Sequence, residues 1–314
     1  MRAVVIQTSQ VAMFLCIEIG GTKLQLVVGD GSGQISERRK LAVNLSLGAQ
    51  GIRNQIEATL PELLRAHKVT AIGVGFGGPV NRETGRIARS HQIEGWSDFD
   101  LAGWLKKISG VCVIAENDAN TAALGEAVRG AGVGFNPAFY VTLGSGVGGG
   151  LVVDGKIYHG ATPGESEIGH VRISPDGTTL ESRCSGWALD QRIRDLNQRH
   201  PNGLLAKLCH GVQDGEARFL VPALEQGDAA ARQILHETAA TLAFGLSHVV
   251  HLFHPAVIIL GGGLSQIGEP LRAAVEKELS PLLMEVFHPG PQIRLASLGE
   301  DAVPTGALLL AGQS

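Results

Sequence analysis

Hydrophobic and polar residues follow one another along the chain in a pattern that predicts an α/β protein. Over residues 14–43, aliphatic and β-branched residues alternate between turn-forming clusters at 20–22 and 30–33, which indicates an antiparallel meander of three strands. Apolar residues then recur at helical spacing over 49–67. A continuous apolar run over 69–76 follows, and it predicts a buried strand that ends in glycines.

The rest of the chain predicts further strands and helices, in an order that restarts at residue 138. The expected strands cover 111–115, 138–143, 149–153, 156–158, 257–260 and 293–296. The expected helices cover 101–109, 119–129, 187–198, 229–253, 271–287 and 305–311. This repetition indicates a duplicated α/β lobe around a central cleft. We expect a small N-terminal lobe over 1–118, to which a C-terminal helix over 300–314 returns, and a large lobe over 119–299.

Composition excludes several classes of protein. Of the 314 residues, 44% are hydrophobic and 18% are charged, which rules out a disordered chain. A net charge of -4 without runs of like charge gives no footprint for nucleic acid or an anionic membrane surface, and no apolar run is long enough to cross a membrane. The four cysteines are scattered, which fits a reducing cytoplasm. Residues 1–12 lack the pattern of a signal peptide, and Met13 stays open as an alternative start.

Glycine is abundant, with 43 residues, and it is clustered rather than periodic. Three glycine-rich turns each follow a predicted strand: IGGTK at 19–23, LGSGVGGG at 143–150 and LGGGLS at 260–265. Successive backbone amides in such turns bind phosphate, although a single glycine cluster is more often only a tight turn. Three of them in one chain favour a nucleotide phosphate site. The sequence has neither a Walker loop nor a GxGxxG turn that opens a helix.

Seven motifs, in order along the chain, carry a resemblance to a known family. They are IEIGGTK at 17–23, GPVN at 78–81, ENDANTAALGE at 116–126, LGSGVGGGLVVDGKI at 143–157, EIGHV at 167–171, LES at 180–182 and ILGGGLS at 259–265. The arrangement resembles the actin-like ATPase superfamily and, more narrowly, the ROK family of bacterial sugar kinases and repressors, from residue 14 to the C-terminus. The resemblance implies a two-lobed, ribonuclease H-like α/β fold with its active site in the interlobe cleft.

The resemblance also implies roles for individual residues. ATP would be bound by the glycine turns, through Gly20, Gly21, Thr22, Lys23, Gly144, Ser145, Gly146, Gly148, Gly261, Gly262 and Gly263. The sugar would be bound by Gly78, Asn117, Asp118, Glu167, His170 and Glu181. Asp118 would be the general base that accepts the proton of the attacking hydroxyl. Its local sequence alone favours a second role, as the cap of the helix that follows.

The chain departs from the family pattern at three places. Glu18 stands where the family has aspartate, and we expect it to bind Mg²⁺ through water. Gly77 stands where proline is usual. The family's CxCGxxGC zinc cluster is missing, because only ten residues separate His170 from Glu181 and none is cysteine. We therefore expect no zinc, Cys184 as a small buried residue, and a connection after His170 that is held by its own PDG turn.

The expected function is that of an ATP-dependent hexose kinase, a glucokinase that forms a sugar 6-phosphate. N-acetylglucosamine or N-acetylmannosamine stays open as the substrate, followed by fructose or allose. The alternatives from other classes are a non-catalytic sugar-sensing protein and an actin-like ATPase that acts on a protein. Only 17 residues precede Glu18, too few for the DNA-binding domain of family repressors, and EIGH with Glu181 favours a sugar ligand. We expect a cytoplasmic homodimer whose partners are a hexose and ATP.

Overall fold

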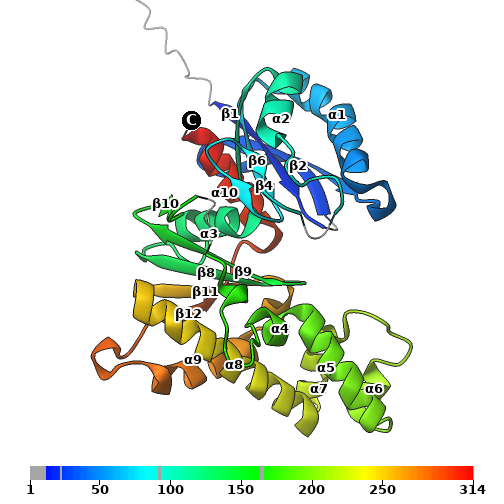
Figure 1. Cartoon of the computed structure of the whole chain (residues 1–314), viewed down its shortest axis with the longest axis vertical. Helices are drawn as coiled ribbons and strands as arrows, with labels where there is room; N and C mark the ends of the chain where they lie inside the picture. The colour runs from blue at the N-terminus through cyan, green and yellow to red at the C-terminus, as the bar shows by residue number, and fades with distance from the viewer. Residues whose placement is uncertain (1–11, 22, 91–92, 163–165, 314) are drawn as a thin grey trace, which may run out of the picture. The chain divides into compact units, whose positions relative to one another are not determined.

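The computed structural model describes residues 12–21, 23–90, 93–162 and 166–313, and these form two compact units (Figure 1). Unit 1 consists of Met1–Thr121 and Val303–Ser314, and unit 2 consists of Ala122–Ala302. Helix α3 (Asp118–Arg129) therefore begins in unit 1 and ends in unit 2, whereas α10 (Ala302–Gly312) belongs to unit 1 except for its first residue. Each unit has a five-stranded sheet of its own.

The sheet of unit 1 has the strand order β3-β2-β1-β4-β7. Its strands are β1 (Met13–Ile19), β2 (Lys23–Asp30), β3 (Ile35–Ala42), β4 (Val69–Phe76) and β7 (Cys112–Asn117). The first three form the predicted antiparallel meander, β4 runs parallel to β1, and β7 runs parallel to β4. A small hairpin of β5 (Val80–Asn81) and β6 (Arg86–Ile87), which the sequence did not predict, follows β4.

Helices cover both faces of this sheet (Figure 1). Helices α1 (Gly48–Ala66) and α2 (Leu101–Ser109) pack their apolar residues on one face, and α10 packs on the other. The approach of α10 is close, because a Cβ atom on Gly73 would lie 2.0 Å from the carbonyl oxygen of Ala307. Packing therefore requires glycine at position 73.

The sheet of unit 2 has the strand order β10-β9-β8-β11-β12. Its strands are β8 (Ala138–Leu143), β9 (Val147–Val153), β10 (Lys156–Ile157), β11 (Val257–Gly261) and β12 (Gln292–Leu295). Strands β8, β9 and β10 form an antiparallel meander, and β11 runs parallel to both β8 and β12. The two units thus repeat one strand order, which confirms the duplication that the sequence predicted.

The helices of unit 2 after α3 are α4 (Glu181–Cys184), α5 (Gly186–Arg199), α6 (Leu204–Leu208), α7 (Leu220–Glu225), α8 (Ala229–Phe253) and α9 (Glu269–Leu279). Helices α8 and α9 run along one face of the sheet (Figure 1), and their buried apolar residues join one core with those of β8 and β11. No helix among the residues that the structure describes is long and apolar enough to cross a membrane.

One expected helix is wrong in its second half. The prediction of a single helix over 271–287 fails beyond Leu279, where the chain continues as the short 3₁₀ turns Ser280–Leu282 and Glu285–Phe287. The physical reason is Pro281, which has no backbone N–H to donate to the preceding turn. The short helices α4, α6 and α7 were not predicted, because a segment of four to six residues carries little periodicity.

Candidate active site

In unit 1, three loops leave the sheet at the same edge. Neighbouring parallel strands end in register, at Ile19, Phe76 and Asn117. The residues that follow are Gly20, Gly77 and Asp118. A Cβ atom on Gly77 would lie 3.5 Å from Oδ2 of Asp118 and 3.5 Å from the Cα atom of Gly20. The fold therefore places the candidate base beside the first glycine turn, although the two motifs are far apart in the sequence.

Asn117 caps helix α3, and Asp118 does not. The Oδ1 atom of Asn117 accepts hydrogen bonds from the N–H of Ala119 at 2.9 Å and of Asn120 at 3.1 Å. Asp118 is the first residue of the helix and is half-buried. The interpretation of Asp118 as the helix cap is therefore wrong, because the residue before it satisfies the free amides. The cap position of this helix thus belongs to Asn117.

Asn117 also joins the end of β7 to the GPVN loop. Its Nδ2 atom donates to the carbonyl of Gly78 at 3.2 Å, so its second amide hydrogen is the donor that it would offer to a sugar. Gly78 has φ +153°, a conformation that favours glycine. The N–H of Gly77 donates to the carbonyl of Ile19 at 2.8 Å. A proline at position 77 has no N–H and could not make this bond. The glycine that replaces the usual proline therefore links the two loops by a hydrogen bond.

Glu18 lies near the end of β1 and is buried, with 8% of its surface exposed. Its Oε1 atom is 3.2 Å from Nζ of Lys23, and its Oε2 atom accepts a hydrogen bond from Nε2 of Gln25. The N–H of Gly20 donates to the carbonyl of Lys23 at 2.7 Å, which closes the turn that contains Gly21. Thr22, the other residue predicted to bind ATP here, lies outside the described residues.

In unit 2, the second glycine turn joins β8 to β9. The N–H of Gly144 donates to the carbonyl of Gly146 at 2.9 Å, and Ser145 lies at the tip between them. Gly148, also predicted to bind ATP, pairs with Thr142 within the sheet. The turn therefore places the exposed residue Ser145 at the carboxyl end of β8, where a phosphate site would lie.

The third glycine turn lies against the second. Gly261 pairs with Thr142 at the end of β11, the parallel neighbour of β8. Gly262 follows with φ +79°, and a Cβ atom there would lie 2.6 Å from backbone atoms of Leu143. Only glycine allows this conformation and this approach. A Cβ atom on Gly263 would meet nothing within 4 Å, so this residue faces open space.

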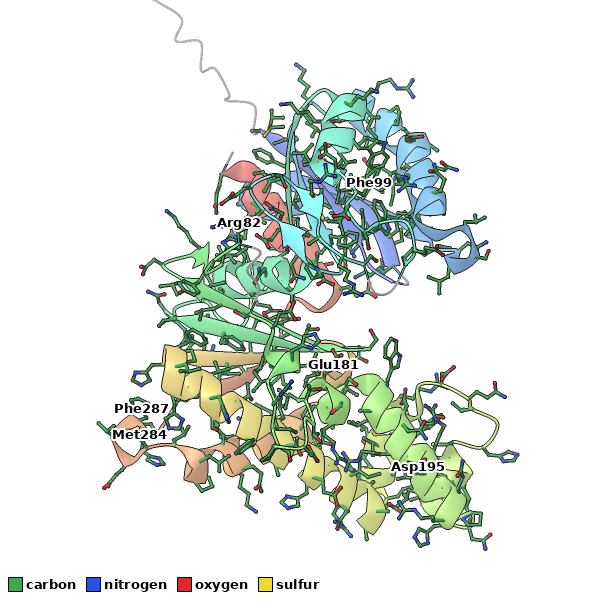
Figure 2. All side chains as sticks on the ribbon, viewed as in Figure 1. Arg82, Phe99, Glu181, Asp195, Met284 and Phe287 are labelled. Carbon is green, nitrogen blue, oxygen red and sulfur yellow. The ribbon has the colours of Figure 1, made fainter. Side chains whose placement is uncertain are left out.

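Two of the predicted sugar-binding motifs pack against the residue that follows the second turn. The N–H of Val147 donates to Oε2 of Glu181 at 2.8 Å, and the carbonyl of Val147 would lie 2.1 Å from a Cβ atom on Gly169. Glu181 is the first residue of α4 and is labelled in Figure 2. Unit 2 thus brings EIGH, Glu181 and the second glycine turn together.

Glu167 precedes the 3₁₀ turn Ile168–His170, and His170 is its last residue; Ile168 of this turn is buried. Their side chains are 45% and 73% exposed, and Oε2 of Glu167 lies 4.0 Å from Nε2 of His170. Such exposure is also typical of solvated surface charges. Their position beside Glu181, rather than burial, favours their assignment to a sugar site.

The connection from His170 to Glu181 is a hydrogen-bonded hairpin. The N–H of Leu180 donates to the carbonyl of Val171 at 2.9 Å, and the N–H of Ile173 donates to the carbonyl of Thr178 at 2.9 Å. The predicted PDG turn is confirmed at its tip, where Asp176 accepts from the N–H of Thr178 at 2.9 Å. The hydrogen bonds from Thr178 hold the pKa of Asp176 below its usual value. Backbone pairing thus fixes the position of Glu181.

Cys184 has the surroundings of a buried thiol, as predicted. It is inaccessible to solvent, and its Sγ atom donates to the carbonyl of Thr238 at 3.7 Å. Burial raises the pKa of the Cys184 thiol to about 12, which disfavours the thiolate that zinc would need. Within the described ranges, His, Cys, Asp and Glu form no group of three that would hold a metal ion.

These surroundings predict a protein that works without zinc. We expect elemental analysis of protein purified without added metal to give well under one zinc per chain. After dialysis against a chelator, magnesium alone should restore full activity, because the hairpin does not depend on a metal. Stoichiometric zinc, or activity that returns only when zinc is added, would show that His170 has metal ligands outside this set.

Glu126, the last residue of ENDANTAALGE, was not assigned a role from the sequence. It is fully buried in unit 2, and its carboxylate accepts three backbone hydrogen bonds. The donors are the N–H groups of Ala131 at 2.8 Å, Ser297 at 3.2 Å and Leu298 at 2.8 Å. Glu126 therefore ties the last turn of α3 to the segment after β12. Its one sequence signal is a glutamate among the alanines and leucine of an apolar helix.

The fold and these loops define a class of protein. Two α/β units of equal strand order, each with glycine turns at the carboxyl ends of parallel strands, form the two-lobed fold of the actin-like ATPase superfamily. Within it the chain belongs to the ROK family, whose model matches residues 14–314. This confirms the resemblance that the seven motifs indicated.

Three relatives show the range of this similarity. A glucokinase from Halalkalibacterium halodurans is 31% identical over 305 residues, which cover 92% of this chain and 92% of the relative. An N-acetylmannosamine kinase from Escherichia coli is 29% identical, over 95% of this chain and 97% of the relative. The crystal structure of a ROK family glucokinase from Streptomyces griseus, in complex with glucose and AMPPNP, has a TM-score of 0.84 and 31% identity, and the match covers 96% of this chain and all of that one.

Proposed function

We propose that this protein is an ATP-dependent hexose kinase whose preferred sugar is glucose. The observation that carries the proposal is the position of Asp118, which is beside the first glycine turn and is not the cap of its helix. The similarity to glucokinases over nearly the whole chain supports the same activity, as does the glucose complex of the Streptomyces griseus enzyme.

In the proposed reaction Asp118 is the general base. Its carboxylate accepts the proton of the sugar 6-hydroxyl as that oxygen forms a bond to the γ-phosphorus of ATP, and the bond from this phosphorus to the β-phosphate oxygen breaks to release ADP. A positioned base contributes about 10² to 10⁴ in rate. The amides of the glycine turns and the ammonium of Lys23 would hold the phosphates.

The sugar would be held by the remaining predicted residues. Asn117 would donate its remaining amide hydrogen to a sugar hydroxyl, next to the backbone of Gly78. Glu167, His170 and Glu181 would form hydrogen bonds with hydroxyls at the opposite edge of the ring. Each hydroxyl that stays unpaired in a closed site opposes binding by about 1 to 3 kcal/mol. These groups therefore select for a hexose with hydroxyls at both edges.

Mg²⁺ is the cofactor that we propose with ATP. Bound to the nucleotide it would neutralise the charge that develops on the transferred phosphoryl group. The carboxylate of Glu18 fits an indirect role, because it supplies the oxygen ligand that Mg²⁺ prefers and each oxygen has a second lone pair beyond those used by Lys23 and Gln25. Mg²⁺ usually keeps several of its waters, through which Glu18 would hold it.

The second candidate substrate is N-acetylmannosamine, which the similarity to the Escherichia coli kinase favours. An ADP-coupled assay with glucose, N-acetylglucosamine, N-acetylmannosamine, fructose and allose separates these substrates. We expect the highest kcat/KM with glucose. A higher value with an N-acetylated sugar would move the assignment to that sugar, and turnover of ATP without any sugar would favour an actin-like ATPase.

The remaining expectations are a homodimer and a cytoplasmic location. Light scattering of the purified protein tests the first, since a homodimer has twice the 32.9 kDa mass of the chain. Fractionation of the producing cells tests the second.

A further inference from the structure

Gln25 is a fully buried polar residue that lies directly opposite Glu18. In the antiparallel pairing of β1 with β2, Glu18 faces Gln25 on the neighbouring strand. The side chain of Gln25 has no exposed surface, and its Nε2 atom donates to Oε2 of Glu18. A buried amide lowers stability unless it is hydrogen-bonded, so its presence between Leu24 and Leu26 of β2 calls for a reason.

The carboxylate of Glu18 contacts Lys23 as well as Gln25. Its second oxygen, Oε1, is 3.2 Å from Nζ of Lys23, whose side chain is 34% exposed. The three residues thus form a chain from the interior, at Gln25, through Glu18 to the surface of the first glycine turn. Lys23 belongs to that turn, since its carbonyl accepts the hydrogen bond that closes it.

Only one of the two strands next to β1 supplies a side chain directly opposite Glu18, and this strand is β2. In the other neighbouring strand, β4, the partner of Glu18 is Gly75, which has no side chain. Of the two residues directly paired with Glu18, Gln25 is therefore the one that can hold the carboxylate. A glutamate side chain loses rotamer freedom when it is fixed. A partner that fixes it beforehand removes this entropy loss from the free energy of ligand binding.

We propose that Gln25 is a positioning residue of the phosphate-transfer site. It holds the Glu18 carboxylate in the one orientation that keeps the Lys23 ammonium at the first glycine turn, ready for the phosphates of ATP. Gln25 touches neither nucleotide nor sugar and acts through Glu18. This inference rests on the proposed function, and it concerns ATP rather than the sugar.

One consequence runs against the family pattern. Glu18→Asp restores the residue that the family has at this position, yet it should lower activity in this chain. The shorter side chain withdraws the carboxylate by about 1.5 Å, the length of one carbon–carbon bond. Neither the bond to Gln25 nor the contact with Lys23 survives such a shift. The extra methylene of Glu18 and the amide of Gln25 therefore work as a pair.

The test is a double-mutant cycle on kcat/KM for ATP, measured at saturating sugar. Gln25→Met keeps the length of the side chain and removes the amide, and Lys23→Met removes the ammonium. We expect Gln25→Met to lower kcat/KM for ATP by about tenfold to a hundredfold, the range for a lost hydrogen bond to a charged group. KM for the sugar should stay within about twofold. In the Lys23→Met background, Gln25→Met should lower kcat/KM by a smaller factor than in the wild type, because part of its effect passes through Lys23.

The matched control is Gln55→Met. Gln55 is also a glutamine of unit 1, and its Nε2 atom donates an exposed hydrogen bond of 2.8 Å to the carbonyl of Ala42. This variant should keep the wild-type kcat/KM. Equal losses from Gln25→Met with and without Lys23 would overturn the proposal, since a general weakening of the fold is additive. An unchanged kcat/KM in Gln25→Met would overturn it as well.

Two further measurements keep the proposal testable in every case. If Gln25→Met does not fold, Glu18→Asp leaves Gln25 in place, and wild-type kcat/KM for ATP in this variant would overturn the inference. If the wild type transfers phosphate to no sugar, the proposed function fails, but calorimetric titration of the same proteins with ATP still reads the role of Gln25. Weaker ATP binding by Gln25→Met, with a smaller loss in the Lys23→Met background, is then the supporting result.

Discussion

The Asp118→Asn variant should fold and bind sugar normally but lose about 10² to 10⁴ in kcat. Asparagine has nearly the same shape as aspartate and cannot accept the proton of the attacking hydroxyl. The cap of α3 is unaffected, because Asn117 provides it. Initial rates of ADP release measure kcat, and calorimetric titration with sugar measures binding.

The control for this variant is the same substitution at a true helix cap. Asp100 precedes α2, and its carboxylate accepts from the N–H of Gly103 at 3.0 Å. Asp100→Asn should keep kcat, because asparagine caps a helix as well as aspartate does. If Asp118→Asn also kept near-normal turnover, Asp118 would be a structural residue and the base would have to be sought elsewhere.

The largest loss of stability should follow from Glu126→Ala. Removal of the buried carboxylate breaks three part-buried hydrogen bonds, from the N–H groups of Ala131, Ser297 and Leu298, and the free energy of unfolding should fall by about 3 to 5 kcal/mol. Denaturation by urea measures this difference. Glu126→Gln should fall between alanine and the wild type, because its amide oxygen still accepts while its NH₂ group faces other donors.

Glu225→Ala is the matched control for stability. Glu225 ends α7 in the same unit and is exposed, so its loss should change the free energy of unfolding by no more than about 0.5 kcal/mol. A wild-type stability of Glu126→Ala would show that water replaces the carboxylate without loss. In that case Glu126 would not anchor the segment after β12.

Elements with strong local signals could be predicted to the residue. Helix α2 begins after the capping Asp100 and ends at Ser109. The next residue, Gly110, has φ +75° and a left-handed conformation, and both the aspartate and the glycine are visible in the sequence. The helix over 271–287 was extended too far because its apolar residues continue at helical spacing past Pro281. There the local effect of proline outweighed the periodicity.

The candidate site was predictable as a set of motifs but not as contacts. In the sequence ENDAN, both Asn117 and Asp118 are good helix caps, and only the position of the first helical residue decides between them. The pairing of Glu18 with Gln25 depends on the register of β1 against β2, which a turn of unknown type does not fix. Glu126 contacts Ser297 and Leu298, which are too distant in sequence for any local pattern to connect.

The central claim is phosphoryl transfer from ATP to a hexose, and mass spectrometry of the product tests it most directly. The wild-type protein is incubated with ATP, magnesium and glucose, and the hexose phosphate and ADP are quantified. We predict equal amounts of ADP and glucose 6-phosphate, with formation slowed by about 10² to 10⁴ in the Asp118→Asn protein. If the protein binds glucose but forms no hexose phosphate from glucose or from any of the other four sugars, the proposed phosphoryl transfer is contradicted. That result would favour a non-catalytic sugar-sensing protein.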